Sequence, residues 1–331
     1  MRSFKFILAF SILFLFICTN ALALGTTPPA TSQISICSFN IKFVGHYKDK
    51  QNEALAAILK NFDIVLIQEL VAPPIDGIYP DNNPYSADKE AKAFVEAMST
   101  HGFEFLISNE DTGTNDQIHS KTSSTEWFIL FYKPDAITEG TDIKSQFIAG
   151  NRANHDDYER VPYAFSLKTI DGKMDFVLIS VHLDSGNDSE SRERRKTELN
   201  AIAEWVDAND DGVEKDFIIL GDMNIYTASE LQNIIPDGFI SLNDECRKTT
   251  TSSKNEYCYD HVMYRPAHTS EIDTVYDLKT INLIEAMEQF WNSENGEYPG
   301  EPYDRHKFPV YYSDHYPVTF KLTVPLSDDD G

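Results

Sequence analysis

Carboxylates, an amide and a histidine stand next to short apolar runs in this chain. Asp222 and Asn224 come just after the run Phe217–Leu220, and Ser-Asp-His occupies positions 313–315. An apolar run of this length indicates a buried strand, so we expect the polar residues past its end to lie in a cleft. A carboxylate that takes a proton from water, an amide that holds a phosphate oxygen, a second carboxylate for a metal and a histidine fit phosphodiester hydrolysis.

Three further segments show the same arrangement. Asn40 follows an apolar segment that begins at Ile34, Glu69 ends the run that begins at Ile64, and His182 lies near the end of the run 176–183. Strands often end in polar residues, so one such case would be weak evidence. Several in one chain predict a common site.

These motifs resemble the endonuclease/exonuclease/phosphatase superfamily, and within it the deoxyribonuclease I branch. The resemblance spans residues 34–324. The stretch Ser-Asp-His-Tyr-Pro-Val at 313–318 and the Thr-rich segment leading to Tyr259-Asp260 favour that branch. The resemblance implies metal-assisted, in-line attack of water on a phosphodiester.

The resemblance also implies a role for each residue. The catalytic set comprises His182, Asp222, Asn224, His315, Asp260 and Glu126. The residues that contact the substrate phosphate are Arg160 and Asn224, and the metal ligands are Glu69, Asn40 and Asp314. Within the set, Glu126 pairs with His182 and Asp260 with His315. We expect Mg²⁺ or Mn²⁺, because such hard cations prefer oxygen ligands and need only one or two protein carboxylates.

One difference from deoxyribonuclease I concerns the residues that bind the substrate. Val71 stands where that family carries an Arg, and Ser124 stands where it carries a Tyr; both family residues read the DNA minor groove. The chemistry is therefore retained, whereas these contacts to duplex DNA are absent.

Three functions remain open at this stage. The first is a secreted, metal-dependent nuclease that cuts DNA, in preference to RNA, endonucleolytically and with low sequence specificity. The second is a lipid phosphodiesterase of the same superfamily, similar to a sphingomyelinase, which would keep every catalytic residue. The third is a binding module with an inactive site, against which the complete residue set argues.

The N-terminus predicts export. Arg2 and Lys5 precede an apolar stretch from Phe6 to Ile17, and Ala-Leu-Ala at 21–23 fits a cleavage site, as in a secretory signal peptide. The stretch is too short for a transmembrane span. We expect a signal peptide at 1–23 and an extracellular or periplasmic, monomeric protein without stable membrane insertion.

The rest of the chain contains no linker-like stretch and no internal repeat. It predicts one domain at 24–326 and an acidic tail at 327–331. Without Arg2 and Lys5 the chain has 26 basic and 53 acidic residues, a net charge of −27. Proteins that bind phosphates through their overall charge are usually basic. The acidic net charge therefore predicts that divalent cations mediate contact with the substrate.

Two local patterns suggest further features. Cys246 and Cys258 flank a loop of 11 residues and are the expected disulfide of an exported protein. Asp207, Asn209 and Asp211 alternate like the start of a calcium loop, which suggests a structural Ca²⁺ ion. Position 12 of that loop is Ile218 and not Glu, so a complete helix-loop-helix site is excluded, and a solvated turn is the alternative.

Apolar periodicity predicts alternating strands and helices. The predicted strands are 34–39, 64–69, 103–107, 125–132, 163–168, 174–183, 217–220, 257–264, 273–278 and 316–324. The predicted helices are 53–60, 87–99, 191–208, 228–234 and 282–290. Asp171-Gly172 predicts a hairpin turn between two of the strands. Mixed hairpin and helix connections favour an α/β fold with two packed mixed β-sheets flanked by helices, and the resemblance implies a four-layer sandwich.

Overall fold

The computed structural model describes residues 32–114, 118–119, 123–150, 157–210, 214–293, 298 and 307–328. The predicted signal peptide lies outside these residues. So does the end of the predicted tail, from residue 329 onward. The described part of the chain contains no helix that is long and apolar enough to cross a membrane.

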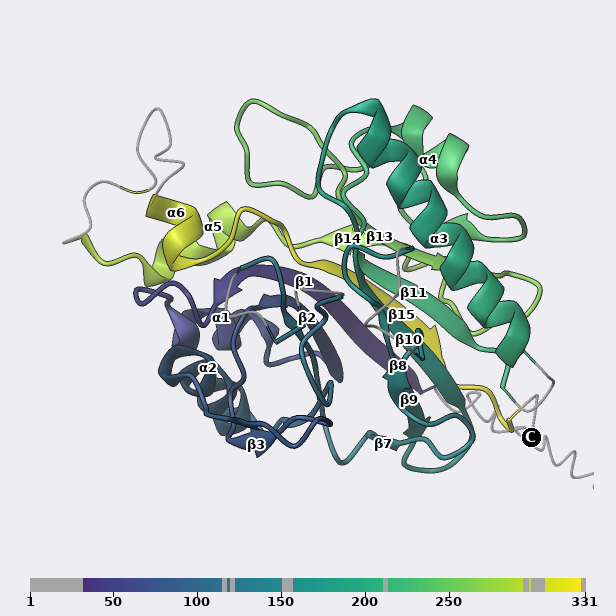
Figure 1. Ribbon diagram of the computed structural model, residues 1–331, viewed down its shortest axis with the longest axis horizontal. Helices are drawn as coiled ribbons and strands as arrows, with labels where there is room; N and C mark the ends of the chain where they lie inside the picture. Colours follow the sequence, from purple (N-terminus) through teal and green to yellow (C-terminus); the bar gives the residue numbers. More distant parts are fainter. Residues whose placement is uncertain are drawn as a thin grey trace, which may run out of the picture. The chain divides into compact units, whose positions relative to one another are not determined.

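Two mixed sheets form the centre of the fold (Figure 1). The first has the order β14-β15-β1-β2-β6-β5. Its strands are β1 (Gln33–Val44), β2 (Ile64–Leu70), β5 (Glu104–Ile107), β6 (Trp127–Tyr132), β14 (Lys279–Thr280) and β15 (Val318–Thr323). Strands β1 and β2 are parallel, and β6 and β15 run antiparallel to them.

The second sheet has the order β12-β13-β11-β10-β9-β7, and β8 pairs with β9. Its strands are β7 (Ile137–Glu139), β8 (Gln146–Phe147), β9 (Tyr163–Thr169), β10 (Asp175–His182), β11 (Phe217–Asp222), β12 (Ile240–Ser241) and β13 (Asp260–Tyr264). Strands β10 and β11 are parallel, and β13 runs antiparallel to β11. A separate hairpin consists of β3 (Gly77–Ile78) and β4 (Pro84–Tyr85).

Helices cover the outer faces of both sheets (Figure 1). The helices are α1 (Asn52–Leu59), α2 (Lys89–Thr100), α3 (Ser189–Asn209), α4 (Ala228–Ile234), α5 (Leu283–Met287), the 3₁₀ helix η3 (Glu288–Phe290) and α6 (Lys307–Tyr311). Side chains cap several N-termini: Asp88 accepts hydrogen bonds from the first turn of α2, and Asp188 and Thr227 do the same for α3 and α4. Such caps satisfy amide groups that have no partner within the helix.

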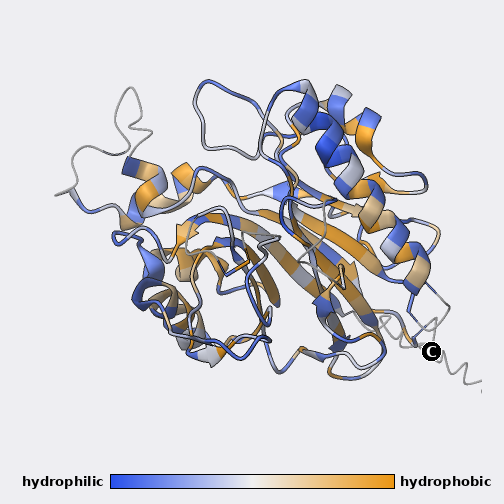
Figure 2. Cartoon of the chain, viewed as in Figure 1, coloured by the Kyte–Doolittle hydropathy of each residue, from blue (hydrophilic) through white to orange (hydrophobic). Residues whose placement is uncertain are grey.

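Alternating side chains divide the interior into three apolar layers. The strands of both sheets are mostly hydrophobic (Figure 2). On β2, Val65 and Ile67 pack with α1 and α2, whereas Leu66 packs between the sheets. On β10, Val177 packs with α3 and Leu178 between the sheets. Successive side chains of a strand point to opposite faces, so a strand buried on both faces is apolar throughout. The four-layer sandwich expected from the sequence is confirmed.

Most predicted elements are present within one to three residues, and α4 has the predicted bounds. Strand β1 is longer than predicted, because it continues through Asn40 to Val44 with a shift of register. The prediction of a strand at 273–278 is wrong. Asp273 Oδ1 instead accepts hydrogen bonds from the backbone N–H groups of Val275 and Tyr276, which makes a side-chain-closed turn before β14.

The predicted disulfide is confirmed: Cys246 and Cys258 are bonded, with their Cα atoms 5.0 Å apart. Cys37 is a buried free thiol in β1.

Candidate active site

The topology brings the predicted polar residues to one end of both sheets. The carboxyl ends of the parallel strands β1 and β2 carry Asn40 and Glu69, and those of β10 and β11 carry His182 and Asp222. Because β13 runs antiparallel to β11, its first residue, Asp260, lies opposite Asp222. Strand β6 starts at the same end, directly after Glu126. His315, three residues before β15, forms a bridge with Thr250.

A glycine positions the central carboxylate. Gly221 has φ +142°, and a Cβ atom there would lie 2.1 Å from the carbonyl oxygen of Val181 on the neighbouring strand. Only glycine fits such close backbone contact. The strands thereby pair up to their last residues, and Asp222 lies beside His182 in the register.

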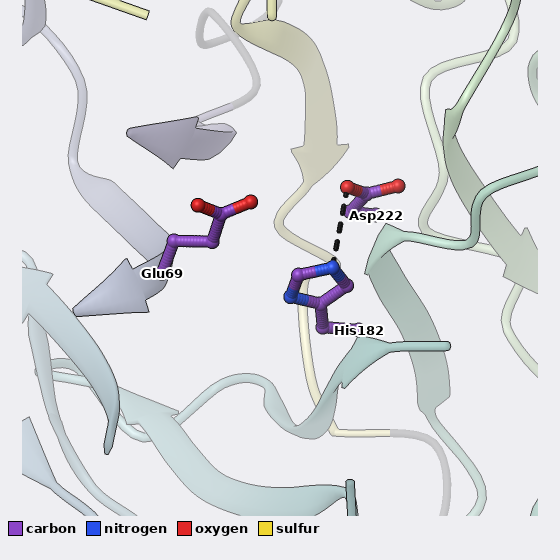
Figure 3. A group of neighbouring side chains, drawn as sticks. All are labelled: Glu69, His182 and Asp222. Carbon is purple, nitrogen blue, oxygen red and sulfur yellow. Dashed lines mark ion pairs between the residues drawn. The ribbon is translucent and has the colours of Figure 1, made fainter. Parts of the chain in front are cut away.

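Asp222 is the centre of the site and is only 2 % exposed. Its Oδ2 accepts a hydrogen bond from Asn40 Nδ2 at 2.8 Å, and its Oδ1 accepts one from the backbone N–H of Asn224 at 2.9 Å. The Nε2 atoms of His182 and His315 lie 3.6 and 3.5 Å from Oδ2. Figure 3 shows His182 directed toward Asp222, with Glu69 on the other side. Asp222 therefore faces both histidines.

Each histidine is held from behind by a carboxylate. His182 Nδ1 lies 2.8 Å from Glu126 Oε1, and His315 Nδ1 lies 2.9 Å from Asp260 Oδ2. A carboxylate at Nδ1 fixes the ring orientation and directs Nε2 into the cleft. The two pairs, which the resemblance implies, thus flank Asp222 from two sides.

Electrostatics set the protonation of this group. Burial lowers the pKa of His315, but the carboxylates of Asp260 and Asp222 outweigh it and raise the pKa to about 10. For His182, burial and Arg160 lower the pKa, whereas Glu126 and Asp222 raise it above its usual value. Burial raises the pKa of Asp222, but the two histidines lower it overall. Asp222 therefore remains a carboxylate, and His315 an imidazolium, at neutral pH.

Glu69 adopts an unusual backbone conformation. Its φ is +63°, in the left-handed region that a residue with a Cβ adopts at an energetic cost. Its backbone N–H donates to Glu126 Oε2, while its side chain accepts hydrogen bonds from Asn40 Nδ2 at 2.8 Å and from the Phe43 N–H at 3.2 Å. These contacts hold the Glu69 carboxylate toward the cleft and link it to the His182 pair.

Asp314 and Asn40 face different groups of the site. Asp314 Oδ2 lies 3.1 Å from Lys42 Nζ, and its Oδ1 is buried without a hydrogen-bond partner among the described residues. Asn40 directs its NH₂ group toward Glu69 and Asp222, and its Oδ1 accepts from the Lys42 N–H. Asn40 therefore bridges two carboxylates in this arrangement.

The donor chemistry fits a hard divalent cation. Within the described residues, two groups bring three metal-binding side chains close together: Glu69–His182–Asp222 and Asp222–Asp260–His315. Asp314 belongs to neither group, but its buried Oδ1 is available to an ion. Carboxylate oxygens without thiolates suit Mg²⁺ or Mn²⁺. By the resemblance, Glu69 and Asp314 are the residues that would hold such an ion.

Two residues predicted to contact phosphate lie at the rim of this group. Arg160 Nε is 3.5 Å from Glu126 Oε1, and its Nη1 is a buried donor without a partner among the described residues. Asn224, whose φ is +49°, donates one amide hydrogen to the Leu183 carbonyl oxygen at 2.9 Å. The second amide hydrogen of Asn224 and the free end of Arg160 can bind a phosphate oxygen.

The calcium prediction receives no support from the described residues. Asp207 and Asn209 belong to the last turn of α3. Asp207 pairs with Arg265, and Asn209 donates to the Trp205 carbonyl oxygen. Asp211 lies outside the described residues.

Several residues of the site were not predicted. Lys42 follows Asn40 by two positions, which was the one available signal, and it supplies a cation beside Asp314. Lys50 is buried, and its ammonium donates to the carbonyl oxygens of Ile41, Pro309 and Tyr312. An ammonium has three donors, so all are satisfied. Nothing in the local sequence distinguishes Lys50 from a surface lysine.

A cavity of about 510 Å³ adjoins the site. Its lining includes Val71, which follows β2, and Thr125, which precedes Glu126. Aromatic rings of Tyr79, Tyr85 and Trp127 form one wall. Val71 and both neighbours of Ser124, Ser123 and Thr125, therefore line this cavity.

The sequence profile of the Endonuclease/Exonuclease/phosphatase family matches residues 37–315. The chain belongs to this family, and its buried His, Asp and Glu cluster is that of a phosphoester hydrolase. No curated protein sequence matches the chain significantly.

Solved structures share the fold at low sequence identity. An endonuclease/exonuclease/phosphatase family protein from Bacteroides thetaiotaomicron is 14% identical, with 90% of this chain and 100% of that chain covered and a TM-score of 0.54. D. rerio TDP2 complexed with single strand DNA product is 15% identical (88% and 98%, TM-score 0.50). A mannosyl-6-phosphatase from Bacteroides thetaiotaomicron VPI-5482 is 14% identical (87% and 98%, TM-score 0.51). These similarities do not single out the deoxyribonuclease I branch.

Proposed function

We propose that this protein is a metal-dependent nuclease that hydrolyses phosphodiester bonds of nucleic acid, with DNA as the first candidate and single strands cut at least as well as duplex. The observation that carries the proposal is Asp222, a buried carboxylate faced by two histidines, each of which is held by its own carboxylate.

The geometry supports in-line attack by water. Asp222 orients the water and accepts its proton, while the water oxygen forms the new bond to phosphorus and the opposite P–O bond breaks. The His315 imidazolium and the Asn224 amide stabilise the charge that builds on the phosphate oxygens. A divalent cation held by Glu69 and Asp314 would further stabilise charge on the phosphate and the leaving oxygen.

The cavity beside the site favours single strands. At Val71 and around Ser124 the chain has small side chains and a hollow in place of groove-reading residues. Few contacts to base edges are then available, so backbone phosphate contacts should dominate and sequence preference should be low. The similar TDP2 structure holds single strand DNA product, which supports the same substrate class for this fold.

We also propose that the protein is exported and acts as a monomer. The signal-like segment at 1–23 and the disulfide between Cys246 and Cys258 support an oxidising compartment.

One assay separates the candidate activities. The mature protein is incubated with plasmid DNA, single-stranded DNA, RNA, sphingomyelin vesicles and mannose 6-phosphate, with and without Mg²⁺. The vesicles are included because Ile78 on the β3–β4 hairpin is 68 % exposed, which a lipid-binding surface would require. We expect metal-dependent cleavage of the nucleic acids. Release of phosphocholine or of inorganic phosphate, with nucleic acids left intact, would refute the proposal.

The strand preference has its own test. Rates are compared on matched single- and double-stranded oligonucleotides for the wild type and for Val71→Arg combined with Ser124→Tyr. We expect the double substitution to raise the relative rate on duplex, because it restores groove contacts. A wild type that strongly prefers duplex, with no change in the double variant, would show that other residues supply these contacts.

A further inference from the structure

Three half-buried tyrosines lie together beside the candidate active site. The ring centroids of Tyr226 and Tyr257 are 5.0 Å apart, those of Tyr226 and Tyr259 are 5.1 Å apart, and those of Tyr257 and Tyr259 are 5.4 Å apart. The ring of Tyr259 is also 5.4 Å from that of His315. The group, which we call the tyrosine cluster, is therefore in direct contact with a residue of the site.

The cluster is assembled from the loops that carry the site. Tyr226 follows Asn224 by two residues, and its hydroxyl donates to the Ser185 carbonyl oxygen at 2.7 Å, just beyond His182. Tyr259 directly precedes Asp260, the partner of His315. The same loops thus position the tyrosines and the groups around the phosphate.

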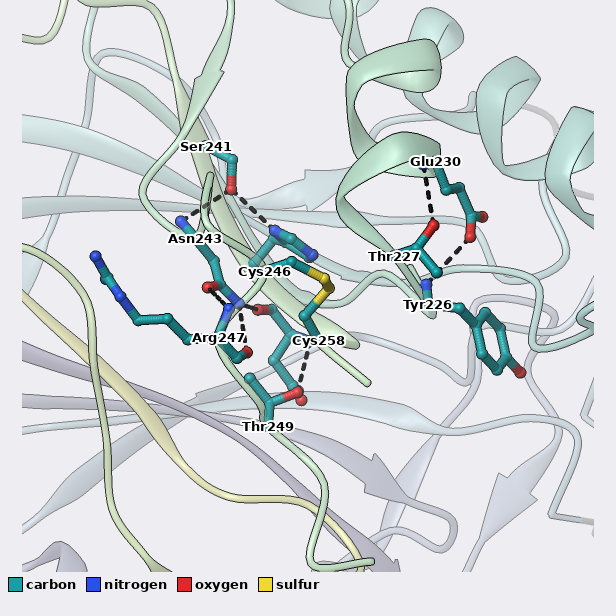
Figure 4. Close-up of a disulfide and its surroundings, with 11 residues drawn as sticks. Tyr226, Thr227, Glu230, Ser241, Asn243, Cys246, Arg247, Thr249 and Cys258 are labelled. Carbon is teal, nitrogen blue, oxygen red and sulfur yellow. Dashed lines mark hydrogen bonds between the residues drawn. A yellow bond between two sulfur atoms is a disulfide. The ribbon is translucent and has the colours of Figure 1, made fainter. Parts of the chain in front are cut away.

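A disulfide holds the segment between two of the tyrosines; Figure 4 shows the bond between Cys246 and Cys258. Cys258 is fully buried and bonded to Cys246, whereas its two neighbours, Tyr257 and Tyr259, are partly exposed. With Cys258 held inward, the two tyrosine rings project on the same side of the chain. The Arg195 guanidinium lies over the Tyr226 ring, 5.5 Å from its centroid, and Arg195 donates a hydrogen bond to Glu230.

The ring geometry leaves aromatic surface for a ligand. The interplanar angles are 72° for Tyr226 with Tyr257, 88° for Tyr226 with Tyr259 and 49° for Tyr257 with Tyr259, so no pair is stacked face to face. Rigid aromatic rings beside a phosphate-binding centre are the surface on which bases of a single strand stack, because every base has a π-face. Duplex DNA keeps its bases stacked on one another and cannot use it.

We propose that the tyrosine cluster is a stacking subsite for a nucleobase next to the scissile phosphate of a single strand. The subsite rests on the nuclease function proposed above and extends it, because it explains how an acidic protein without groove-reading residues grips its substrate.

The test uses a short single strand with one hydrolysable phosphodiester, whose other linkages are methylphosphonates. The base on either side of that bond is replaced in turn by an abasic tetrahydrofuran. For the wild type we expect kcat/KM to fall by about 5- to 100-fold when the stacked base is removed, the usual size for base–aromatic stacking. Tyr257→Leu should lower kcat/KM on the intact strand by a similar factor. On the abasic strand its kcat/KM should be close to that of the wild type.

Two matched variants guard against indirect effects. Tyr257→Phe keeps the ring and should retain the wild-type rate. Tyr132→Leu removes a half-buried tyrosine opposite Ile64, at the far end of β2 from Glu69, and should leave the base dependence unchanged. Thermal unfolding of each variant shows that the fold is kept.

A binding measurement separates the two proposals. The affinity for a strand made entirely of methylphosphonates, with and without the base, is measured by fluorescence anisotropy. Cleavage without dependence on the base or on Tyr257 would overturn the subsite while the nuclease function stands. Base- and Tyr257-dependent binding without any cleavage would overturn the nuclease function and leave the tyrosine cluster as a base-binding site only. Absence of both cleavage and base-dependent binding would overturn both the nuclease function and the subsite.

Discussion

Asp222 contacts two amide residues and both histidines of the site. It contacts Asn40 and Asn224 by hydrogen bonds and faces the Nε2 atoms of His182 and His315. A buried carboxylate is tolerated when hydrogen bonds and opposite charges compensate its desolvation. The same compensation keeps Asp222 charged and able to orient water.

Replacement of His182, Asp222 or His315 by Ala should each lower kcat by about 10²–10⁴, because each removes a proton-transfer or charge-stabilising group. The fold should survive, since these side chains end strands at the cleft and contribute little to the apolar layers. Steady-state kinetics with Mg²⁺ and circular dichroism check both points. A variant that keeps more than about a third of the wild-type rate would be removed from the catalytic set.

The pKa of His315 gives a prediction for stability against pH. The pKa is about 10 in the folded state and 6.5 for an ordinary histidine, so it is raised on folding. The stability that His315 contributes is therefore fully present below pH 6.5 and is lost as the pH rises through about 10. The melting temperature of the wild type should fall over this window more than that of His315→Gln. His101→Gln, on a helix end, is the control and should follow the wild type.

At the scale of elements, the geometry of the site depends on contacts between β1 and the segment around α6. Lys50 makes this connection through carbonyl oxygens on both: Ile41 in β1, Pro309 in α6, and Tyr312 just before the Ser-Asp-His motif. Ser313 adds a second link, since its hydroxyl donates to the Asn40 carbonyl oxygen at 2.6 Å and accepts from the His315 N–H at 3.0 Å. The hydrogen bonds of Lys50 and Ser313 thereby position both Asn40 and His315.

Lys50→Met should lower the free energy of unfolding by about 2–4 kcal/mol, because it leaves buried carbonyl oxygens without a donor. It should also lower activity, since the Ser-Asp-His segment is no longer held against β1. Urea denaturation and kinetics measure the two effects. The exposed Lys48→Met is the matched control and should change neither. An unchanged midpoint for Lys50→Met would show that Ser313 and the apolar contacts suffice.

For the whole molecule, the decisive property is the acidic charge. The chain has 28 basic and 53 acidic residues, a formal net charge of −25 with the N-terminal segment included. The proposed nucleic acid substrate also carries negative charge, so its approach would need local cations such as Lys42 and Arg160 and a bound metal. The site meets this requirement by placing its few cations beside the carboxylates.

Activity should disappear with a chelator and return with Mg²⁺ or Mn²⁺, the hard cations that carboxylate ligands suit. The experiment titrates each ion into the chelated protein and follows oligonucleotide cleavage. Glu69→Gln should raise the Mg²⁺ concentration needed for half-maximal rate. Full activity in excess chelator would contradict the mechanism.

The sequence by itself determined the longer strands, the polar residues at their ends and the loop that the disulfide closes. Apolar runs such as Phe217–Leu220 and 176–183 are local patterns, and burial of a strand requires them, so they could be identified along the chain. The motif residues Glu69, Asp222 and His315 followed from the same runs and from the family resemblance. Their side-chain contacts could not be derived from spacing alone.

Only the tertiary structure decided how those ends meet and what surrounds them. The left-handed backbone of Glu69, the extension of β1 past Asn40 and the burial of Lys50 depend on partners distant in the sequence. The tyrosine cluster likewise joins Tyr226 to Tyr257 and Tyr259 across two loops. Local periodicity reports which face of an element is buried, but it carries no information about which distant residue lies against that face. For this protein, the polar residues at the strand ends could therefore be predicted from the sequence, whereas the tyrosine cluster beside them could be identified only from the packed structure.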